Sequence, residues 1–185
     1  MKTEFKHLQA AHCENGVTTN LLRTIGIENM TEPMTFGIGS GLFYVLLPFL
    51  KINNGPAIAF RTMPGLIFKR TCNALDIPVF RKKFNSKESG KRFLDECLEK
   101  GQAVGCQVGV YYLTYFPKEY RFHFNAHNMI VFGKEADRYL ISDPVMKQLL
   151  PYLIMNWKEC GLQKARLRQE DRSIIQKNQR SLPMT

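Results

Sequence analysis

The sequence lacks the long apolar segments that would place it in a membrane or export it. Its longest apolar run, Gly41 to Leu50, covers about ten residues and contains Pro48, whereas a membrane-spanning helix needs ~20. We expect this run to be a buried strand or helix segment. The N-terminus, MKTEFKHLQAAHCENG, has no apolar core of the signal-peptide kind. The sequence therefore predicts a cytoplasmic protein without a membrane span.

Cysteine is scarce, and its spacing excludes two common uses. The five cysteines are odd in number and none forms a CxxC pair; they are Cys13, Cys72, Cys97, Cys106 and Cys160. A disulfide framework or a zinc site is not expected, and we predict neither metal nor cofactor. Internal repeats and low-complexity segments are also absent, so a chain of 185 residues predicts one domain.

Positive charge is in excess. The formal net charge of +10 indicates an acidic partner such as nucleic acid, an anionic membrane face or an acidic carrier protein. The basic run Arg81-Lys82-Lys83 is not interleaved with aromatics as in an RNA-binding signature, so we interpret it as a solvated face and predict no nucleic-acid partner. Residues 1–146 carry a net +5 and the much shorter segment 147–185 carries another +5.

Predicted helices dominate the first half of the chain and predicted strands the second half. Apolar periodicity and caps predict helices over 13–25, 64–75 and 86–100, the last between an N-cap at Ser86 and a stop at Gly101. Alternation predicts strands over 57–61, 79–84, 103–115, 129–133 and 138–141, with turns at 53–56 and 134–137. This order is typical of an α+β fold with an antiparallel C-terminal sheet.

Cys13 stands where the first predicted helix begins. A helix N-terminus offers unpaired N–H groups and positive potential, which favour a thiolate, and the N–H of Cys13 is placed to help stabilise an oxyanion. The neighbouring His12 could cap the helix or line a pocket. A cysteine is more often an inert buried hydrophobe, and we keep that interpretation for the buried candidates Cys72, Cys97 and Cys106.

His127 and Asp143 flank two predicted strands. His127 precedes one strand, and Asp143 ends the next and is followed by Pro144. Adjacent antiparallel strands lie ~5 Å apart, so the carboxylate could hold the imidazole in one tautomer and orientation. The spacing is equally compatible with Asp143-Pro144 as a simple turn and His127 as a surface residue.

The glycine-rich string GIGSG spans residues 37–41. It lacks the GK[ST] ending of a P-loop and the βαβ context of a dinucleotide fingerprint. We expect Gly37 and Gly39 to allow close backbone approach to a neighbouring segment or a substrate pocket instead.

Several blocks, in order, resemble the N-terminal domain of the butirosin biosynthesis protein H family. They are HCENGVTTNLL, EPMTFGIGSGLFYVLLPF, FRTMPGLIFK, YYLTYFPKEYRFHFNAHNMIVFG and YLISDPV, and the resemblance covers roughly residues 7–146. The family is similar to papain-like cysteine peptidases, including those that process bacteriocin leaders. The resemblance implies a papain-like fold, with N-terminal helices carrying the cysteine and a C-terminal antiparallel sheet carrying the histidine and aspartate.

The resemblance also implies chemistry. The founding activity of the family moves an acyl group from an acyl carrier protein thioester, through an enzyme thioester, to an amine of an aminoglycoside. Cys13 would be the nucleophile, His127 the general base and Asp143 the orienting carboxylate. Papain-like peptidases carry an oxyanion glutamine before the cysteine; Gln9 stands closer to Cys13 than is usual there, so Gln9 and His12 are both candidate donors.

Three functions follow from these observations. The first is an acyltransferase of secondary metabolism whose partners are an acyl carrier protein, bearing a phosphopantetheine-linked donor, and a small-molecule amine acceptor. The alternatives are a cysteine peptidase and a non-catalytic binding or scaffold domain.

The segment 147–185 departs from the family resemblance, which stops after Met146. We interpret 1–146 as the papain-like domain and 147–185 as a basic, frameshifted tail without packing partners. Read one nucleotide earlier, the codon pairs Met155-Asn156, Asn156-Trp157 and Trp157-Lys158 necessarily encode Glu, Leu and Glu. With permitted synonymous codons, the segment becomes TLSDYELERVRFAKGAFAPRGQIYY, which resembles the expected family continuation. Such a chain would be poorly active or unstable, because it would lack the region that completes the acceptor site.

Overall fold

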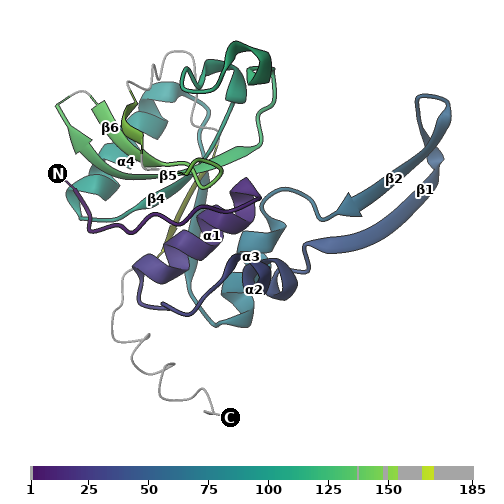
Figure 1. Cartoon of the computed structure of the whole chain (residues 1–185), viewed down its shortest axis with the longest axis horizontal. Helices are drawn as coiled ribbons and strands as arrows, with labels where there is room; N and C mark the ends of the chain where they lie inside the picture. The colour runs from purple at the N-terminus through teal and green to yellow at the C-terminus, as the bar shows by residue number, and fades with distance from the viewer. Residues whose placement is uncertain (1, 137, 148–149, 154–163, 169–185) are drawn as a thin grey trace, which may run out of the picture.

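The computed structural model describes residues 2–136, 138–147, 150–153 and 164–168. Three helices gather beside a six-stranded sheet, and a two-stranded hairpin extends away from both (Figure 1). The helices of this group are α1 (Cys13–Thr24), α2 (Glu32–Ile38) and α3 (Leu66–Ala74). The hairpin consists of β1 (Leu42–Ile52) and β2 (Gly55–Arg61).

The sheet is antiparallel throughout and has the strand order β3-β8-β4-β5-β6-β7. Its strands are β3 (Val79–Lys83), β4 (Val104–Val108), β5 (His127–Glu135), β6 (Arg138–Ser142), β7 (Leu150–Leu153) and β8 (Lys164–Arg168). The connection from β4 to β5 contains two short 3-10 turns, Val110–Tyr112 and Lys118–Tyr120. The predicted α+β fold with an antiparallel sheet is confirmed.

The central strands β4 and β5 are buried on both faces of the sheet. The alternating directions of the side chains along β5 explain this burial. Met129 and Val131 pack on the side of α4 (Lys87–Glu99), in a cluster with Leu94 and Leu98 of that helix. Ile130 and Phe132 point to the other side and pack with Val17 of α1. Successive strand side chains face opposite ways, so this strand holds α4 and α1 on opposite faces of one sheet.

Local signals set the ends of the helices. The hydroxyl of Ser86 accepts a hydrogen bond from the N–H of Ser89, as an N-cap does, and Gly101 beyond α4 has a φ of 71°. The turn between β1 and β2 places Asn53 and Asn54 at positive φ, a region that asparagine tolerates better than most residues. The predicted cap, stop and turn are therefore confirmed.

Three predictions from the sequence are corrected by the structure. The run Gly41 to Leu50 is an exposed strand of the hairpin and not a buried segment; Phe49, for example, is 83% exposed. The strand predicted over 103–115 ends at Val108, because the N–H of Val110 instead donates to the carbonyl of Phe124 and the chain turns.

The third correction concerns the tail. Residues 150–153 pair with β6, and residues 164–168 pair with both β3 and β4. The expectation that the tail has no packing partners is therefore wrong for these two segments. The rest of the tail beyond Lys147, including the codon pairs discussed above, lies outside the described residues.

Candidate functional site

Cys13 is the first residue of α1, and the chain before it is held by a carboxylate. The two oxygens of Glu32 accept the N–H groups of Ala11 and His12, each at 2.8 Å. His12 is the N-cap residue by backbone conformation, and its carbonyl accepts the N–H of Gly16. The backbone that presents the thiol is thus fixed on both sides of Cys13, by a carboxylate before it and by the helix after it.

Gly16 lets α1 approach the turn that follows β6. A Cβ at this position would lie 2.4 Å from Cβ of Pro144 and 2.6 Å from Cβ of Ala10. The N–H of Ala10 also donates to the carbonyl of Pro144 at 2.7 Å. A glycine, which is a poor helix former, is therefore required here by close packing, and this packing brings the start of α1 to the Asp143-Pro144 turn.

His127 begins β5 opposite Val108 of β4, and Asp143 follows β6. Nε2 of His127 lies 2.6 Å from Oδ2 of Asp143, whose side chain is fully buried. The hydroxyl of Tyr115 donates to the same oxygen at 2.6 Å, and the N–H of Val145 donates to Oδ1 at 3.2 Å. Asp143 is therefore oriented by partners at both oxygens, and it can in turn orient the imidazole.

The electrostatics of His127 favour its cation. Burial alone would lower the pKa of His127, but hydrogen bonds to Asp143 and Cys13, together with their negative charge, raise it to about 9. Phe116 packs edge-on against the imidazole, with the ring centroids 5.5 Å apart. This aromatic contact covers one side of the His127–Asp143 pair.

The electrostatics of Cys13 favour its thiolate. Burial alone would raise the pKa of the Cys13 thiol. The net effect is a lowered pKa, because the thiolate is stabilised by the hydrogen bond and charge of His127 and by the backbone and side-chain donors of Asn128. Nδ2 of Asn128 lies 3.7 Å from Sγ of Cys13. Since Nε2 of His127 is occupied by Asp143, Nδ1 is the ring nitrogen left for the sulfur. We call Cys13, His127 and Asp143 the Cys-His-Asp cluster.

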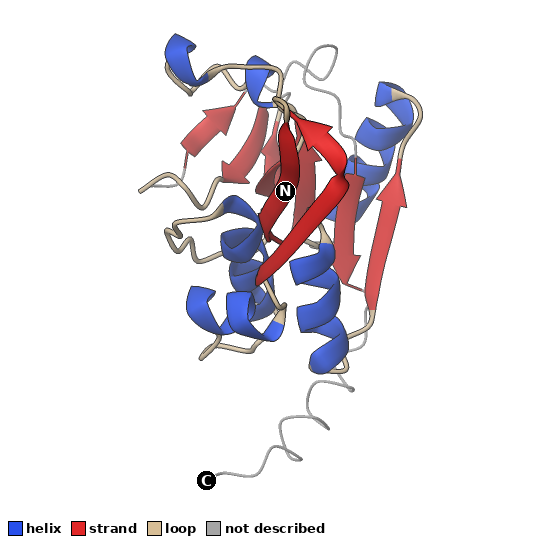
Figure 2. Ribbon diagram, turned by 90° about the vertical axis from the view of Figure 1, so that its right-hand side faces the viewer, coloured by secondary structure: helices blue, strands red, loops and turns tan. Residues whose placement is uncertain are grey.

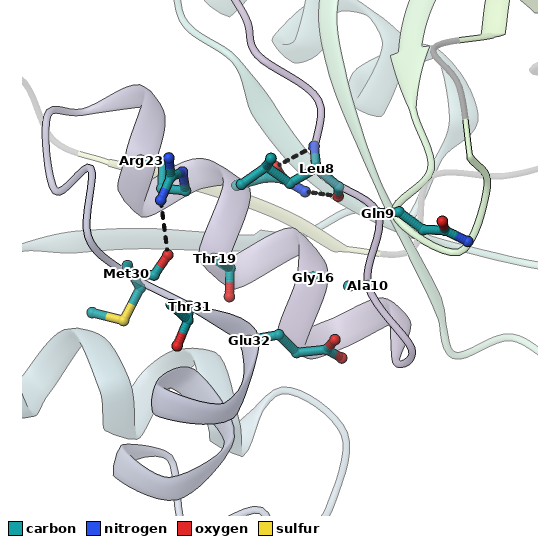
Figure 3. Close-up of a pocket in the computed structure, with 10 residues that line it drawn as sticks. Leu8, Gln9, Ala10, Gly16, Thr19, Arg23, Met30, Thr31 and Glu32 are labelled. Atoms are coloured by element: carbon teal, nitrogen blue, oxygen red, sulfur yellow. Dashed lines mark hydrogen bonds between the residues drawn. The ribbon is translucent and has the colours of Figure 1, made fainter.

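Other candidate residues from the sequence do not join this cluster. Gly39 packs α2 against Ile67 of α3, and Gly37 is exposed at the end of α2. Gln9 is exposed and lines a pocket between residues 8–10, α1 and the segment that leads into α2, where Figure 3 shows its amide pointing away from Glu32. Neither Cys13 nor His127 lines that pocket. His12 lies beside Cys13, and its Nδ1 is buried without a hydrogen-bond partner.

Three residues that support the cluster are not predicted by the sequence: Asn128, Tyr115 and Glu32. Asn128 directly follows His127, and strand alternation predicts opposite directions for neighbours, so their convergence on Cys13 was not expected. Tyr115 fell within a predicted strand that in fact ends earlier. Glu32 carried only the signal of an acidic residue at a helix start.

Comparison with solved structures places the chain among cysteine peptidase folds. A protein from Bacillus anthracis described as a C39-like peptidase superposes with a TM-score of 0.59 at 14% identity, covering 92% of this chain and 99% of that one. The peptidase domain of Streptococcus ComA, a bi-functional ABC transporter of a quorum-sensing pathway, gives a TM-score of 0.55 at 12% identity, covering 90% of this chain and all of that domain (100%). The fold is therefore papain-like.

Sequence comparison identifies the family more narrowly. No curated protein sequence gives a match to this chain. Among the described residues, none of the helices is long and apolar enough to cross a membrane. The sequence model of the family described as "Butirosin biosynthesis protein H, N-terminal" matches residues 12–144, which include all three members of the Cys-His-Asp cluster. The chain accordingly belongs to the butirosin biosynthesis protein H family.

Proposed function

We propose that this protein is an acyltransferase that moves an acyl group from an acyl carrier protein thioester, through a thioester on Cys13, to an amine acceptor in secondary metabolism. The observation that carries the proposal is the arrangement around Cys13. His127 and Asn128 lower the pKa of its thiol, while Asp143 and the thiol raise the pKa of His127 to about 9. Both shifts favour a thiolate–imidazolium pair, and such a pair supports nucleophilic catalysis.

In the first step, the Cys13 thiolate attacks the carbonyl carbon of the donor thioester. The carbon–sulfur bond to phosphopantetheine breaks, and the departing sulfur takes the proton of the His127 imidazolium. Both sulfurs are comparable leaving groups, so this exchange has little thermodynamic penalty. The products are the acyl-enzyme, the free carrier thiol and a neutral His127.

In the second step, the neutral His127 accepts the proton of the attacking amine. The amine nitrogen bonds to the acyl carbon, the bond to Sγ of Cys13 breaks, and an amide leaves. Asp143 stabilises the imidazolium that forms again. The resting thiolate–imidazolium pair is thereby restored without any external oxidant or reductant.

An oxyanion forms in both steps and needs donors. The N–H of Cys13 belongs to the first turn of α1, whose N–H groups have no partner within the helix, and it is the first donor that we propose. His12, whose Nδ1 is buried and unpartnered, is the second candidate. The exposed Gln9 is less favourably placed for this role.

A cysteine peptidase is the second candidate function, because both solved structures compared above are described as peptidases. It would use the same nucleophile and base but would attack a peptide, and water would release the acyl group. The two activities differ in donor and acceptor and so can be separated by one experiment.

The test is intact-protein and peptide mass spectrometry after incubation with an acyl-loaded carrier protein, with an acyl-pantetheine surrogate and with peptides. We expect an acyl adduct on Cys13 that disappears when an amine is added. The Cys13→Ala variant should lose roughly 10⁴–10⁶-fold in rate, whereas the buried-thiol control Cys97→Ala should retain the adduct. Adduct formation that is undiminished in Cys13→Ala would contradict the proposal, and cleavage of peptides without thioester exchange would favour the peptidase.

A further inference from the structure

The hairpin formed by β1 and β2 stands apart from the rest of the molecule. Figure 1 shows it projecting beyond the helices α2 and α3, and in Figure 2 it lies in front of the rest of the molecule, toward the viewer. Its two strands pair with each other from Leu42↔Arg61 to Ile52↔Gly55, and within the described chain neither belongs to the six-stranded sheet. An isolated two-stranded ribbon is at best marginally stable in water, so this element needs cover from outside the described fold.

One face of the hairpin is an apolar stripe. Leu46 and Ile58 are register partners, and the rings of Tyr44 and Phe60 lie 5.6 Å apart on the same face. These four side chains are between 45% and 62% exposed. The opposite face carries smaller or better covered residues, such as the buried Ala57. We call Tyr44, Leu46, Ile58 and Phe60 the hairpin stripe.

The exposed apolar surface is large enough for a stable interface. Five further apolar residues of β1 lie near the base and the tip of the hairpin, and each is at least 40% exposed: Leu42, Phe43, Phe49, Leu50 and Ile52. With 150–250 Å² for a whole aromatic side chain, the hairpin exposes roughly 700–1,000 Å² of apolar side chain. Monomeric proteins seldom expose so much in one patch, and a standard interface buries about 800 Å² on each partner.

Charge indicates what the partner is. Between Leu42 and Phe60 the only charged residue is Lys51, although the chain as a whole carries +10. An acidic carrier protein or a nucleic acid would be met by several lysines and arginines, and the hairpin stripe contains none. Insertion into a bilayer would bury apolar residues at the tip of the hairpin, whereas the apolar residues here run along its whole length. This distribution favours a protein partner over a membrane.

We propose that the hairpin is a dimerisation arm, whose stripe packs face to face on the same stripe of a second copy. A two-fold interface needs a self-complementary patch, and an uncharged apolar sheet face provides one. Two such faces pack about 10 Å apart, as sheets in a sandwich do. The hairpin stripe itself carries no charge, so two copies of a strongly basic chain can associate through it without bringing like charges together on that face.

Light scattering coupled to size-exclusion chromatography tests this proposal on the full chain. We expect a dimer, and we expect Phe60→Lys and Tyr44→Lys to give monomers with unchanged circular dichroism. Phe122→Lys is the matched control, because Phe122 is 58% exposed but lies outside the hairpin, and it should remain dimeric. Co-purification of two differently tagged copies should show the same pattern.

Several outcomes would overturn the proposal. They are a wild-type chain that is monomeric, a dimer that survives both Phe60→Lys and Tyr44→Lys, and a monomer that binds lipid vesicles through the hairpin. None of these results depends on acyl transfer, so they leave the proposed function to its own test.

Discussion

Asn128 is the residue whose replacement tests the electrostatics of Cys13 most directly. Its side-chain amide lies 3.7 Å from the sulfur and donates at the same time to the carbonyl of Ala126 at 2.9 Å. Its backbone N–H also lowers the pKa of the thiol. Asn128→Ala removes the side-chain donor and leaves the backbone donor, so the pKa of Cys13 should rise while His127 and Asp143 stay in place.

The size of the effect follows from the geometry. A hydrogen bond to a charged group contributes ~1.5–3 kcal/mol, but a contact of 3.7 Å to sulfur belongs at or below the low end of that range. A loss of ~1 kcal/mol corresponds to a thiolate fraction about fivefold smaller at a pH below the thiol pKa. Asn128→Asp should act in the same direction and more strongly, because it places a carboxylate beside the sulfur.

The assay is the pH dependence of Cys13 alkylation by iodoacetamide, with the modified peptide identified by mass spectrometry. The midpoint of the profile is the readout, because a more basic thiolate is also intrinsically more nucleophilic. Cys97 is an internal control, since burial raises the pKa of its thiol to about 11. Asn73→Ala, on the exposed side of α3, is the matched control. Superimposable profiles for wild type and Asn128→Ala would refute the role of this amide.

Three further predictions concern the frame around the site. Gly16→Ala should lower the rates of Cys13 alkylation and acylation by up to ~10²-fold, because the new Cβ collides with Pro144 and misplaces α1. In the control Gly37→Ala the new Cβ meets nothing within 4 Å, so the rates should not change. Equal rates in the two variants would contradict the packing argument. The pKa of His127 is raised from 6.5 to about 9, so its stabilising contribution is full below pH 6.5 and is lost as the pH rises through 9. The melting-temperature advantage of wild type over His127→Gln should therefore shrink over that interval, and an advantage that grows with pH would exclude the assigned cation. For the segment after Met146, sequencing of the gene should find a frame, read one nucleotide earlier, that stays open and encodes family-like residues; stop codons close behind this point would reject the frameshift.

The sequence by itself determined most local elements. A start at Cys13 and apolar residues at helical spacing defined α1, and the Ser86 cap with the Gly101 stop defined α4. Alternating apolar residues located β5 and β6 to within a few residues. These features depend on short-range interactions, such as capping and one-sided burial, that a window of ten to twenty residues contains. The family resemblance added the cysteine, histidine and aspartate as a set.

Tertiary structure alone decided which side chains meet at Cys13. Asn128 is 115 positions from Cys13 in the chain. The packing of Gly16 against Pro144 and of Val17 against Ile130 brings α1 to β5 and to the turn after β6. Tyr115 reaches Asp143 because β4 ends early and the chain turns. The exposed hairpin shows the same limit of sequence-based prediction. Its apolar composition predicts that the segment is covered, but it does not predict which part of the molecule, or which partner, covers it. Burial and pKa depend on distances between remote segments, and these distances are set by the packing of the whole domain.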